Sequence, residues 1–280
     1  MDARLGSPGR TSGMDTTSAG AMGHAMTGPP DGRWLRRFRD SDDGETKVIC
    51  FPHAGAVAGE YRTWPEGLPP DIGVMAVRYP GREERFDDPI PPRLEALADD
   101  IAGALGELAR QPVVLFGHCF GATVAHEVAL RLQEQGSPPA ALCVSGTRPP
   151  HALAGRSTVP STDEDIIAHV RTLDANRAAA FADPMLREAV LPAVRGDYHL
   201  VGGYSGGSRP PLACPIYAYA GDEDPELAPE EMRGWADMTR GGFRFRVLPG
   251  GHFFLKSAEP ALLADMRNVL DAVRTGTTVA

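Results

Sequence analysis

Cysteine is scarce in this sequence, and its spacing follows no ligand pattern. The four cysteines are Cys50, Cys119, Cys143 and Cys214, and no two of them form a CxxC or CxxxC pair. This excludes a disulfide-stapled small fold and the usual zinc and iron–sulfur frameworks, so we expect no metal. All except Cys119 lie in apolar runs and are predicted to be buried. Such usage is typical of a reducing compartment, and we predict a cytoplasmic protein.

Basic residues and long apolar segments are also in short supply. The 28 Lys and Arg residues are outnumbered by 37 Asp and Glu residues, which gives a net charge of −9. This charge argues against a nucleic acid or an anionic membrane as partner. No apolar run approaches the roughly 20 residues that span a bilayer. The N-terminus lacks the basic start and apolar stretch of a signal peptide, so we expect no membrane attachment.

The first part of the chain has almost no large apolar side chains. Residues 1–33 are rich in Gly, Ser, Thr, Pro and Met. Such a segment cannot bury enough surface to offset its ordering entropy, and we predict a disordered tail. The composition changes at Trp34, and residues 34–280 are predicted to form one domain.

Short apolar runs and helical patterns alternate through this domain. Six runs, most of them without polar alternation, predict strands that are covered on both faces. They are 46–52, 72–79, 112–117, 140–146, 214–221 and 243–248. Helical periodicity appears over 94–108, 122–135, 229–240 and 257–274. This order predicts an α/β fold with a mostly parallel central sheet flanked by helices.

The interval between the fourth and fifth predicted strands breaks the alternation. Residues 160–205 carry no strand pattern and predict two or three helices. An insertion at this point lies over the carboxyl ends of the strands, where open sheets place their ligands. We therefore predict a helical lid above the functional site.

The sharpest motif is Gly117-His118-Cys119-Phe120-Gly121, which follows the third predicted strand and begins a helix. It has the G-x-C-x-G form of a nucleophile elbow, whose usual central residue is Ser. The two glycines allow close packing around a strained turn that lifts the Cys119 thiol away from the sheet. The helix N-terminus favours the thiolate, and the Phe120 N–H points at a developing oxyanion. We predict that Cys119 is a catalytic nucleophile, with a passive cysteine in a glycine-bounded turn as the alternative.

Such a nucleophile needs a base and a group that orients the base. His252 follows the sixth predicted strand, and Asp222 and Asp224 follow the fifth. Each alone is typical of an ordinary turn. Together they share the carboxyl edge of the sheet with Cys119, in the chain order nucleophile, acid, histidine. We prefer Asp224 to Asp222 as the acid because Asp224 lies further past the strand and precedes Pro225.

The loop after the first predicted strand reads PHAGA over 52–56. Its small residues bring backbone N–H groups close to a ligand, and this loop supplies the second oxyanion donor in such a fold. We predict that Ala54 is this donor, alongside Phe120. His53 is a candidate substrate contact, with a locally hydrogen-bonded loop histidine as the alternative.

Six segments resemble the type II thioesterases, the stand-alone α/β-hydrolases that accompany polyketide synthases and nonribosomal peptide synthetases. They are FPHAGA at 51–56, YPGREERF at 79–86, GHCFGA at 117–122, LPAVRGDYHLVGGY at 191–204, GDEDP at 221–225 and GGHFFL at 250–255. The resemblance covers about 34–273. It implies the α/β-hydrolase fold with a helical lid.

The resemblance implies hydrolysis of an acyl thioester on the phosphopantetheine arm of an acyl or peptidyl carrier protein. Small acyl thioesters are then expected to be substrates too. Carried over residue by residue, Cys119 takes the nucleophile position, His252 the base and Asp224 the acid. The amides of Ala54 and Phe120 take the oxyanion positions. The departure is Cys119 itself, since the family reads G-H-S-x-G; no cofactor is implied, and we expect a monomer.

Two further residues are candidate substrate contacts. Arg82 lies between Arg78 and Arg85 near the expected mouth of the site. It is a candidate contact for an acidic carrier protein or the pantetheine phosphate, with pairing to nearby acidic residues as the alternative. His118, beside the predicted nucleophile, is the other candidate.

Two other functions stay open, and the cysteine favours the first of them. An acyl group passes between thiols nearly isoenergetically, and the resulting thioester reacts more readily with amines than with water. A trans-acting acyltransferase or cyclase, with an amine, an alcohol or a second carrier as acceptor, is therefore one alternative. A non-catalytic carrier-binding module is the other, and the intact His252 and Asp224 positions argue against it.

Overall fold

The fold is described from a computed structural model, which covers residues 30–40, 45–153, 160, 162–207 and 209–277. Residues 1–29 of the predicted tail lie outside this described part, so disorder there stays a prediction. The last residues of that segment, Pro30–Arg33, form a single 3-10 turn, η1.

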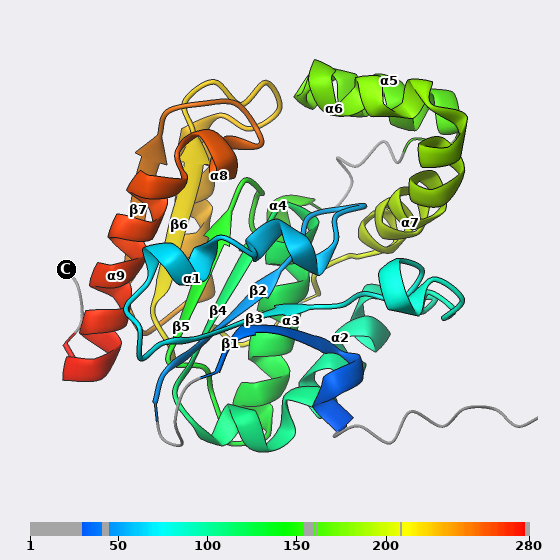
Figure 1. Cartoon of the computed structure of the whole chain (residues 1–280). Coiled ribbons are helices and arrows are strands. Elements are labelled where there is room, and N and C mark those ends of the chain that lie inside the picture. Colours follow the sequence, from blue (N-terminus) through cyan, green and yellow to red (C-terminus); the bar gives the residue numbers. More distant parts are fainter. Residues whose placement is uncertain (1–29, 41–44, 154–159, 161, 208, 278–280) are drawn as a thin grey trace, which may run out of the picture.

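A seven-stranded sheet forms the centre of the molecule, with the strand order β1-β3-β2-β4-β5-β6-β7 (Figure 1). All six predicted strands are present, and every neighbouring pair from β3 to β7 is parallel. They are β2 (Lys47–Phe51), β3 (Gly73–Val77), β4 (Val113–His118), β5 (Ala141–Ser145), β6 (Ile216–Gly221) and β7 (Phe243–Leu248). Strands β2 to β6 are buried along their whole length, as their unbroken apolar runs predicted.

The seventh strand was not predicted from the sequence. Strand β1 (Leu35–Arg39) pairs antiparallel with β3 at the edge of the sheet. Its sequence, LRRFR, holds three arginines and has no apolar run. An edge strand tolerates this composition because only one side of it joins the sheet. Arg39 fixes the end of the strand by donating to the carbonyls of Ile72 at 2.9 Å and Pro65 at 2.7 Å.

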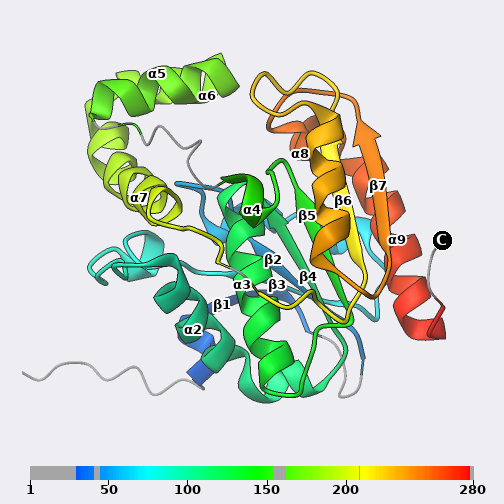
Figure 2. The same cartoon turned by 180° about the vertical axis from the view of Figure 1, so that it is seen from behind.

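Helices cover both faces of the sheet (Figures 1 and 2). On one face α2 (Leu94–Leu105), α3 (Phe120–Glu134) and the 3-10 helix η6 (Pro229–Met238) share a hydrophobic core with the sheet. On the other face lie α1 (Trp64–Gly67), α8 (Phe254–Ser257) and α9 (Glu259–Thr275). Successive residues of β2 serve opposite cores, Val48 one and Ile49 the other, as the strand pleat requires.

Three predicted helices differ in detail from the structure. The helix predicted over 94–108 ends at Leu105, because Gly106 has a φ of 31° and the chain continues as the 3-10 turn η4 (Gly106–Arg110). The segment predicted over 229–240 is 3-10 rather than α-helical. The helix predicted over 257–274 corresponds to α9, and the short separate helix α8 before it was not predicted. Within the described residues, no helix has both the length and the apolar character needed to cross a membrane.

The predicted helical insertion between β5 and β6 is confirmed. It contains α5 (Asp163–Leu173), α6 (Ala175–Ala179), the short η5 (Ala180–Ala182) and α7 (Pro184–Gly202). Three side-chain N-caps, Thr162, Asp174 and Asp183, begin the three α-helices. In Figure 1 the helices form an arch above the carboxyl ends of the strands, and we call α5–α7 the lid.

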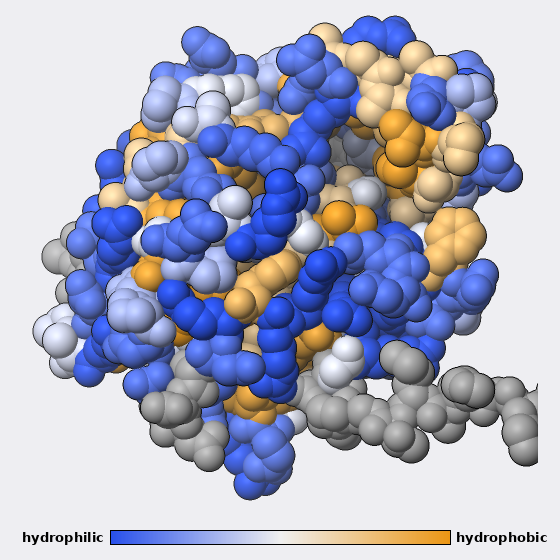
Figure 3. Space-filling model, viewed as in Figure 1, coloured by the Kyte–Doolittle hydropathy of each residue, from blue (hydrophilic) through white to orange (hydrophobic). Residues whose placement is uncertain are grey.

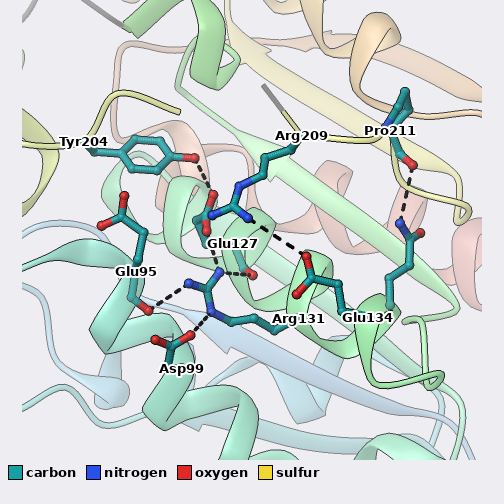
Figure 4. A network of polar contacts seen from close by, with 9 residues as sticks. Glu95, Asp99, Glu127, Arg131, Glu134, Tyr204, Arg209 and Pro211 are labelled. Carbon is teal, nitrogen blue, oxygen red and sulfur yellow. Dashed lines mark hydrogen bonds and ion pairs between the residues drawn. The ribbon is translucent and has the colours of Figure 1, made fainter. Parts of the chain in front are cut away.

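A buried polar network fastens the base of the lid to the core (Figure 4). Tyr204, just beyond α7, donates its hydroxyl to the Glu127 carboxylate of α3 at 2.7 Å. The other oxygen of Glu127 pairs with Arg131, which also donates to the Glu95 carbonyl at the start of α2, at 3.0 Å. Glu127 is fully buried, so these bonds replace the water that its charge would otherwise need. The network joins the lid to α2 and α3.

Shorter helical segments complete the connections between these elements. They are η2 (Ala58–Tyr61), η3 (Glu83–Arg85) and α4 (Pro150–Leu153). The first two follow β2 and β3, and α4 follows β5. All three therefore lie past the carboxyl ends of parallel strands, on the side of the sheet that faces the lid.

Candidate active site

Cys119 occupies a strained turn between β4 and α3. Its φ is 53° and its ψ is −121°, a conformation that a residue with a side chain rarely adopts. Gly117 and Gly121 make the turn possible. A Cβ at Gly117 would lie 2.3 Å from the Gly121 carbonyl oxygen, and a Cβ at Gly121 would lie 2.0 Å from that of Phe51. Strand and helix are thus in backbone contact, which is the geometry of a nucleophile elbow.

The elbow is also tied to the neighbouring strand. The Cys119 N–H donates to the Ser145 carbonyl at the end of β5, at 2.8 Å. Helix α3 begins at the next residue, Phe120, so its first N–H groups have no acceptor within the helix. These groups and the helix dipole favour negative charge beside Cys119.

His252 and Asp224 form a buried pair next to the elbow. His252 Nδ1 lies 2.7 Å from Asp224 Oδ2, and the two side chains are 5% and 0% exposed. The second oxygen of Asp224 accepts the Glu226 N–H at 3.0 Å, which holds the carboxylate in place. Asp222 instead accepts the Gly250 N–H at 2.8 Å on the exposed side of the loop. The structure therefore brings Asp224, and not Asp222, to the histidine.

The environment of His252 favours its charged form. Burial works against the imidazolium, but the neighbouring Cys119 sulfur and the Asp224 carboxylate outweigh it and raise the pKa of His252 to about 10. Nε2 is buried and has no nitrogen or oxygen partner among the described residues. The ring is thus held by Asp224 on one side, with its other nitrogen on the side of the sulfur. This arrangement suits a histidine that exchanges a proton with the group at the elbow.

The predicted oxyanion residues line the same cavity as Cys119 and His252. The cavity has a volume of about 370 Å³, and both Ala54 and Phe120 contribute to its wall. From the lid, Tyr198 adds to the wall as well. Figure 3 shows apolar side chains gathered around a hollow beneath the arch. Cys119, His252 and the two residues predicted to supply the oxyanion amides therefore all border one cavity.

The three predicted substrate contacts do not line this cavity. His118 is completely buried, with Nδ1 3.0 Å from the Ser145 hydroxyl and its ring 5.2 Å from that of His252. His53 lies beneath the lid with Nε2 3.1 Å from an Arg177 nitrogen. Burial lowers the pKa of both histidines well below the usual range, so neither carries a charge for a phosphate.

Arg82 is likewise absent from the lining of the cavity. Its guanidinium is 5% exposed and makes a two-pronged ion pair with Asp197 of α7, at 2.7 and 2.8 Å. Glu83, which follows Arg82 in sequence, pairs with Arg36 instead. The sequence could not reveal the Asp197 contact because the partner lies 115 positions away.

Several cavity residues were not predicted from the sequence. His169 of α5 lies 3.1 Å from the Glu226 carboxylate, and this contact joins the lid to the loop that carries Asp224. The His169 ring packs against Tyr198 at 5.3 Å. Tyr198 and Val201 had a signal, since both belong to the 191–204 segment of the resemblance. Within the described part of the chain, no cluster of three or more His, Cys, Asp or Glu side chains is suited to a metal ion.

A mostly parallel sheet with a nucleophile elbow after β4, an acid after β6 and a histidine after β7 defines the α/β-hydrolase class. Comparison with known proteins narrows this class. The model of the thioesterase domain family matches residues 46–270. The chain therefore belongs to the thioesterase family.

Individual relatives agree with this assignment. The probable cadicidin biosynthesis thioesterase of Streptomyces griseus is 36% identical over 85% of this chain, and the match spans 66% of that relative. Thioesterase PikA5 of Streptomyces venezuelae is 33% identical over 87% of each chain. Among solved structures, the type II thioesterase BorB from the borrelidin biosynthetic cluster superposes with a TM-score of 0.78 at 37% identity, over 85% of this chain and 97% of its own. RedJ, a thioesterase of the prodiginine pathway in Streptomyces coelicolor, gives 0.77 at 34% identity, over 82% and 88%.

Proposed function

We propose that this chain is a type II thioesterase that hydrolyses acyl groups from phosphopantetheinyl carrier proteins of a polyketide or nonribosomal peptide synthase, through an acyl-Cys119 intermediate. The observation that carries the proposal is the Cys119 elbow beside the buried His252–Asp224 pair, with sulfur and imidazole facing one cavity. The relationship to BorB, a type II thioesterase, supports the substrate class. The sulfur at the elbow supports the cysteine intermediate.

The site geometry suggests an order of steps for this reaction. The Cys119 thiolate attacks the thioester carbonyl, and the N–H groups of Ala54 and Phe120 hold the resulting oxyanion. The oxyanion collapses, the C–S bond to pantetheine breaks, and the leaving thiolate takes the proton of the His252 imidazolium. His252, now neutral, removes a proton from water as the water attacks the acyl-Cys119 thioester. Collapse releases the carboxylic acid and restores the thiolate–imidazolium pair.

Asp224 contributes to these reaction steps through His252. Its carboxylate binds Nδ1 and thereby directs Nε2 toward the reacting atoms in both halves of the cycle. It also stabilises the imidazolium that the first half requires. No cofactor takes part in any of these steps.

Intact-protein mass spectrometry with a panel of acyl-pantetheine thioesters tests the proposal. We expect a transient acyl adduct on the parent protein together with release of free acid. Peptide mapping should place the adduct on Cys119, because the other three cysteines are buried. If no thioester in the panel acylates the protein or yields free acid, the proposed function is wrong.

The sulfur nucleophile favours acyl transfer as a second candidate function, since an acyl-cysteine is itself a thioester. The same experiment separates the two functions when it is repeated with added amine, alcohol or carrier acceptors. A persistent adduct on the parent that is cleared only by an acceptor supports transfer. The Cys119→Ser variant is the matched comparison, because its adduct is an ester on the same elbow. Faster release of acid from the serine variant than from the parent would also argue for transfer.

The pH dependence of hydrolysis is expected to follow His252. Because its pKa is raised from 6.5 to about 10, the imidazolium persists as the pH rises and is lost only near pH 10. We therefore expect kcat/KM to hold through pH 9 and to fall above it. Asp224→Asn removes a contact that favours the imidazolium, so the fall should move to lower pH and kcat should drop by roughly 10²–10⁴-fold.

Asp222→Asn is the matched control for this pH profile. It lies on the same loop, but its side chain accepts the Gly250 N–H and does not contact His252. The profile of this variant should coincide with that of the parent. Equal displacement of the profile by the two substitutions would contradict the role given to Asp224.

A further inference from the structure

The loop that carries Ala54 is a tight turn of four residues. The Ala56 N–H donates to the His53 carbonyl at 3.0 Å, which closes a four-residue turn. Gly55 has a φ of 73°, whereas Ala54 is not among the described residues with positive φ. Positive φ at the third position alone defines a type II turn, which differs from type I by a flip of the central peptide. The orientation of the Ala54–Gly55 peptide, which carries the Ala54 carbonyl and the Gly55 N–H, therefore distinguishes the two forms of the turn.

A carboxylate from the lid holds this central peptide. The Gly55 N–H donates to Asp197 Oδ2 of α7 at 2.8 Å, and Asp197 is 1% exposed. Because this N–H is engaged by Asp197, it is not the amide that serves an oxyanion. Ala54, one residue earlier, lines the cavity with Cys119. The hydrogen bond from the Gly55 N–H thus fixes the orientation of the Ala54–Gly55 peptide. This peptide comes directly after the Ala54 N–H, the predicted oxyanion donor.

Arg82 completes the arrangement. Its guanidinium holds both oxygens of Asp197 and also donates to the Ala56 carbonyl at 3.2 Å. The pair therefore binds the turn at two points, the Gly55 N–H and the Ala56 carbonyl. A buried ion pair adds little stability compared with apolar packing, but its two-pronged geometry is specific in direction. Orientation of the turn, more than stability, is what this pair supplies.

Helix α7 also packs directly on the turn. A Cβ at Gly55 would lie 2.3 Å from a methyl carbon of Val194, one helical turn before Asp197. A Cβ at Gly196 would lie 2.4 Å from Ile90, which belongs to the loop after β3. Helix α7 thus lies between the His53–Ala56 turn and the loop that carries Arg82. The position of α7 and the form of the turn are mechanically linked.

We propose that Asp197, supported by Arg82, is a positioning residue that holds the His53–Ala56 turn in the form in which the Ala54 amide faces the oxyanion. The inference rests on the proposed function, since it concerns the same oxyanion. It assigns a task to the lid beyond covering the cavity, because the oxyanion hole is complete only when α7 is seated.

The test compares Asp197→Asn and Asp197→Ala with Asp265→Asn. Asp265 is an equally buried carboxylate that accepts from Tyr219, Arg244 and Arg246 at 2.8–2.9 Å, on the opposite face of the sheet from α2 and α3. Each variant is measured for kcat and KM with an acyl-pantetheine thioester and for melting temperature. Two probes of Cys119 are added. The thiolate adds to the carbonyl of a trifluoromethyl ketone and forms an alkoxide. With iodoacetamide the thiolate displaces iodide, and no oxyanion forms.

Loss of oxyanion stabilisation has a distinct pattern in these measurements. Asp197→Ala should lower kcat by about 10²-fold with little change in KM, because one oxyanion donor is worth about that factor. Affinity for the trifluoromethyl ketone should fall by a similar factor, whereas the iodoacetamide rate should stay at the parent value. Asp197→Asn, which retains an acceptor for Gly55, should lie between Asp197→Ala and the parent. Asp265→Asn should lower the melting temperature alone.

Two outcomes overturn the proposal. One is a lowered melting temperature with parent kcat and parent ketone affinity in the Asp197 variants. The other is a loss of iodoacetamide reactivity that matches the loss of kcat. If Asp197→Ala does not fold, Arg82→Lys serves in its place, since it keeps the charge but not the two-pronged contact. If the parent hydrolyses no thioester but its ketone affinity still depends on Asp197, only the proposed substrate is wrong.

Discussion

Replacing Cys119 with alanine is expected to lower kcat for thioester hydrolysis by at least about ten-thousand-fold. The alanine variant has no group that can form the acyl intermediate, whereas the cavity and the oxyanion amides remain. KM should therefore change little, and the residual rate should reflect binding and oxyanion stabilisation of direct attack by water. Release of free acid from an acyl-pantetheine thioester, followed by chromatography, measures the effect. The acyl adduct seen by mass spectrometry should disappear as well.

Ser145→Ala is the matched control for this substitution. Ser145 ends the neighbouring strand β5 and contributes the hydroxyl that lies 3.0 Å from His118 Nδ1. This hydroxyl is completely buried and does not line the cavity, so its removal should leave kcat close to the parent value. Undiminished hydrolysis in Cys119→Ala would refute the cysteine mechanism. Loss of hydrolysis in Ser145→Ala, with Cys119→Ala active, would move the nucleophile to the hydroxyl.

Much of the fold could be predicted because parallel strands carry a strong local signal. Strands covered on both faces need unbroken apolar runs, and the runs of β2 and β4 were recognisable for that reason. Strand β1 was missed because an edge strand needs no such run, and LRRFR reads as a polar segment. The end of α2 at Gly106 was missed by three residues, since periodicity continues through Leu108 although the backbone conformation changes.

The pair of residues beside the elbow could be predicted from the sequence for a different reason. Cys119, Asp224 and His252 each lie within four residues of the end of a strand, so the order of the strands alone places them at one edge. Asp224 was distinguished from Asp222 by its greater distance from the strand end, and the 2.7 Å contact with His252 agrees with that choice.

The surroundings of the three predicted substrate contacts could not be predicted from the sequence. Arg82 faces inward because Asp197, on a helix far along the chain, offers it a buried carboxylate. His118 faces the interior because Cys119, its neighbour, takes the outward position at the apex of the elbow. Charge and hydrogen-bonding capacity mark such residues as functional candidates, but burial by distant elements decides their role.

The lid shows even more clearly that contacts between distant parts of the chain could not be predicted from the sequence. Its helices were predictable from the absence of a strand pattern, and their N-caps are visible in the sequence. Its attachments at Glu127 and at Gly55 are not, since each joins residues separated by more than seventy positions. These attachments are what make the lid part of the site.

The second large predicted effect is on stability, because β2 and α3 approach each other closely. Gly121→Ala should lower the free energy of unfolding by about 3 kcal/mol, at the upper end for overpacked sites. The added methyl group meets the backbone oxygens of Phe51 at 2.0 Å and Pro52 at 2.5 Å, and neither can rotate away as a side chain would. Helix α3 must therefore shift from β2, which also displaces Cys119. Urea denaturation should show the loss, together with a fall in kcat.

Gly103→Ala is the control that isolates this steric term. Gly103 lies in the exposed face of α2, and a Cβ there would meet no atom within 4 Å. Alanine is the better helix former, so the variant should be more stable than the parent by about 0.5–1 kcal/mol. The same preference acts at Gly121, so the difference between the stability changes of the two variants measures the clash. A Gly121→Ala variant as stable as Gly103→Ala would mean that β2 and α3 are not in backbone contact, and the strained conformation of Cys119 would then lose its structural cause.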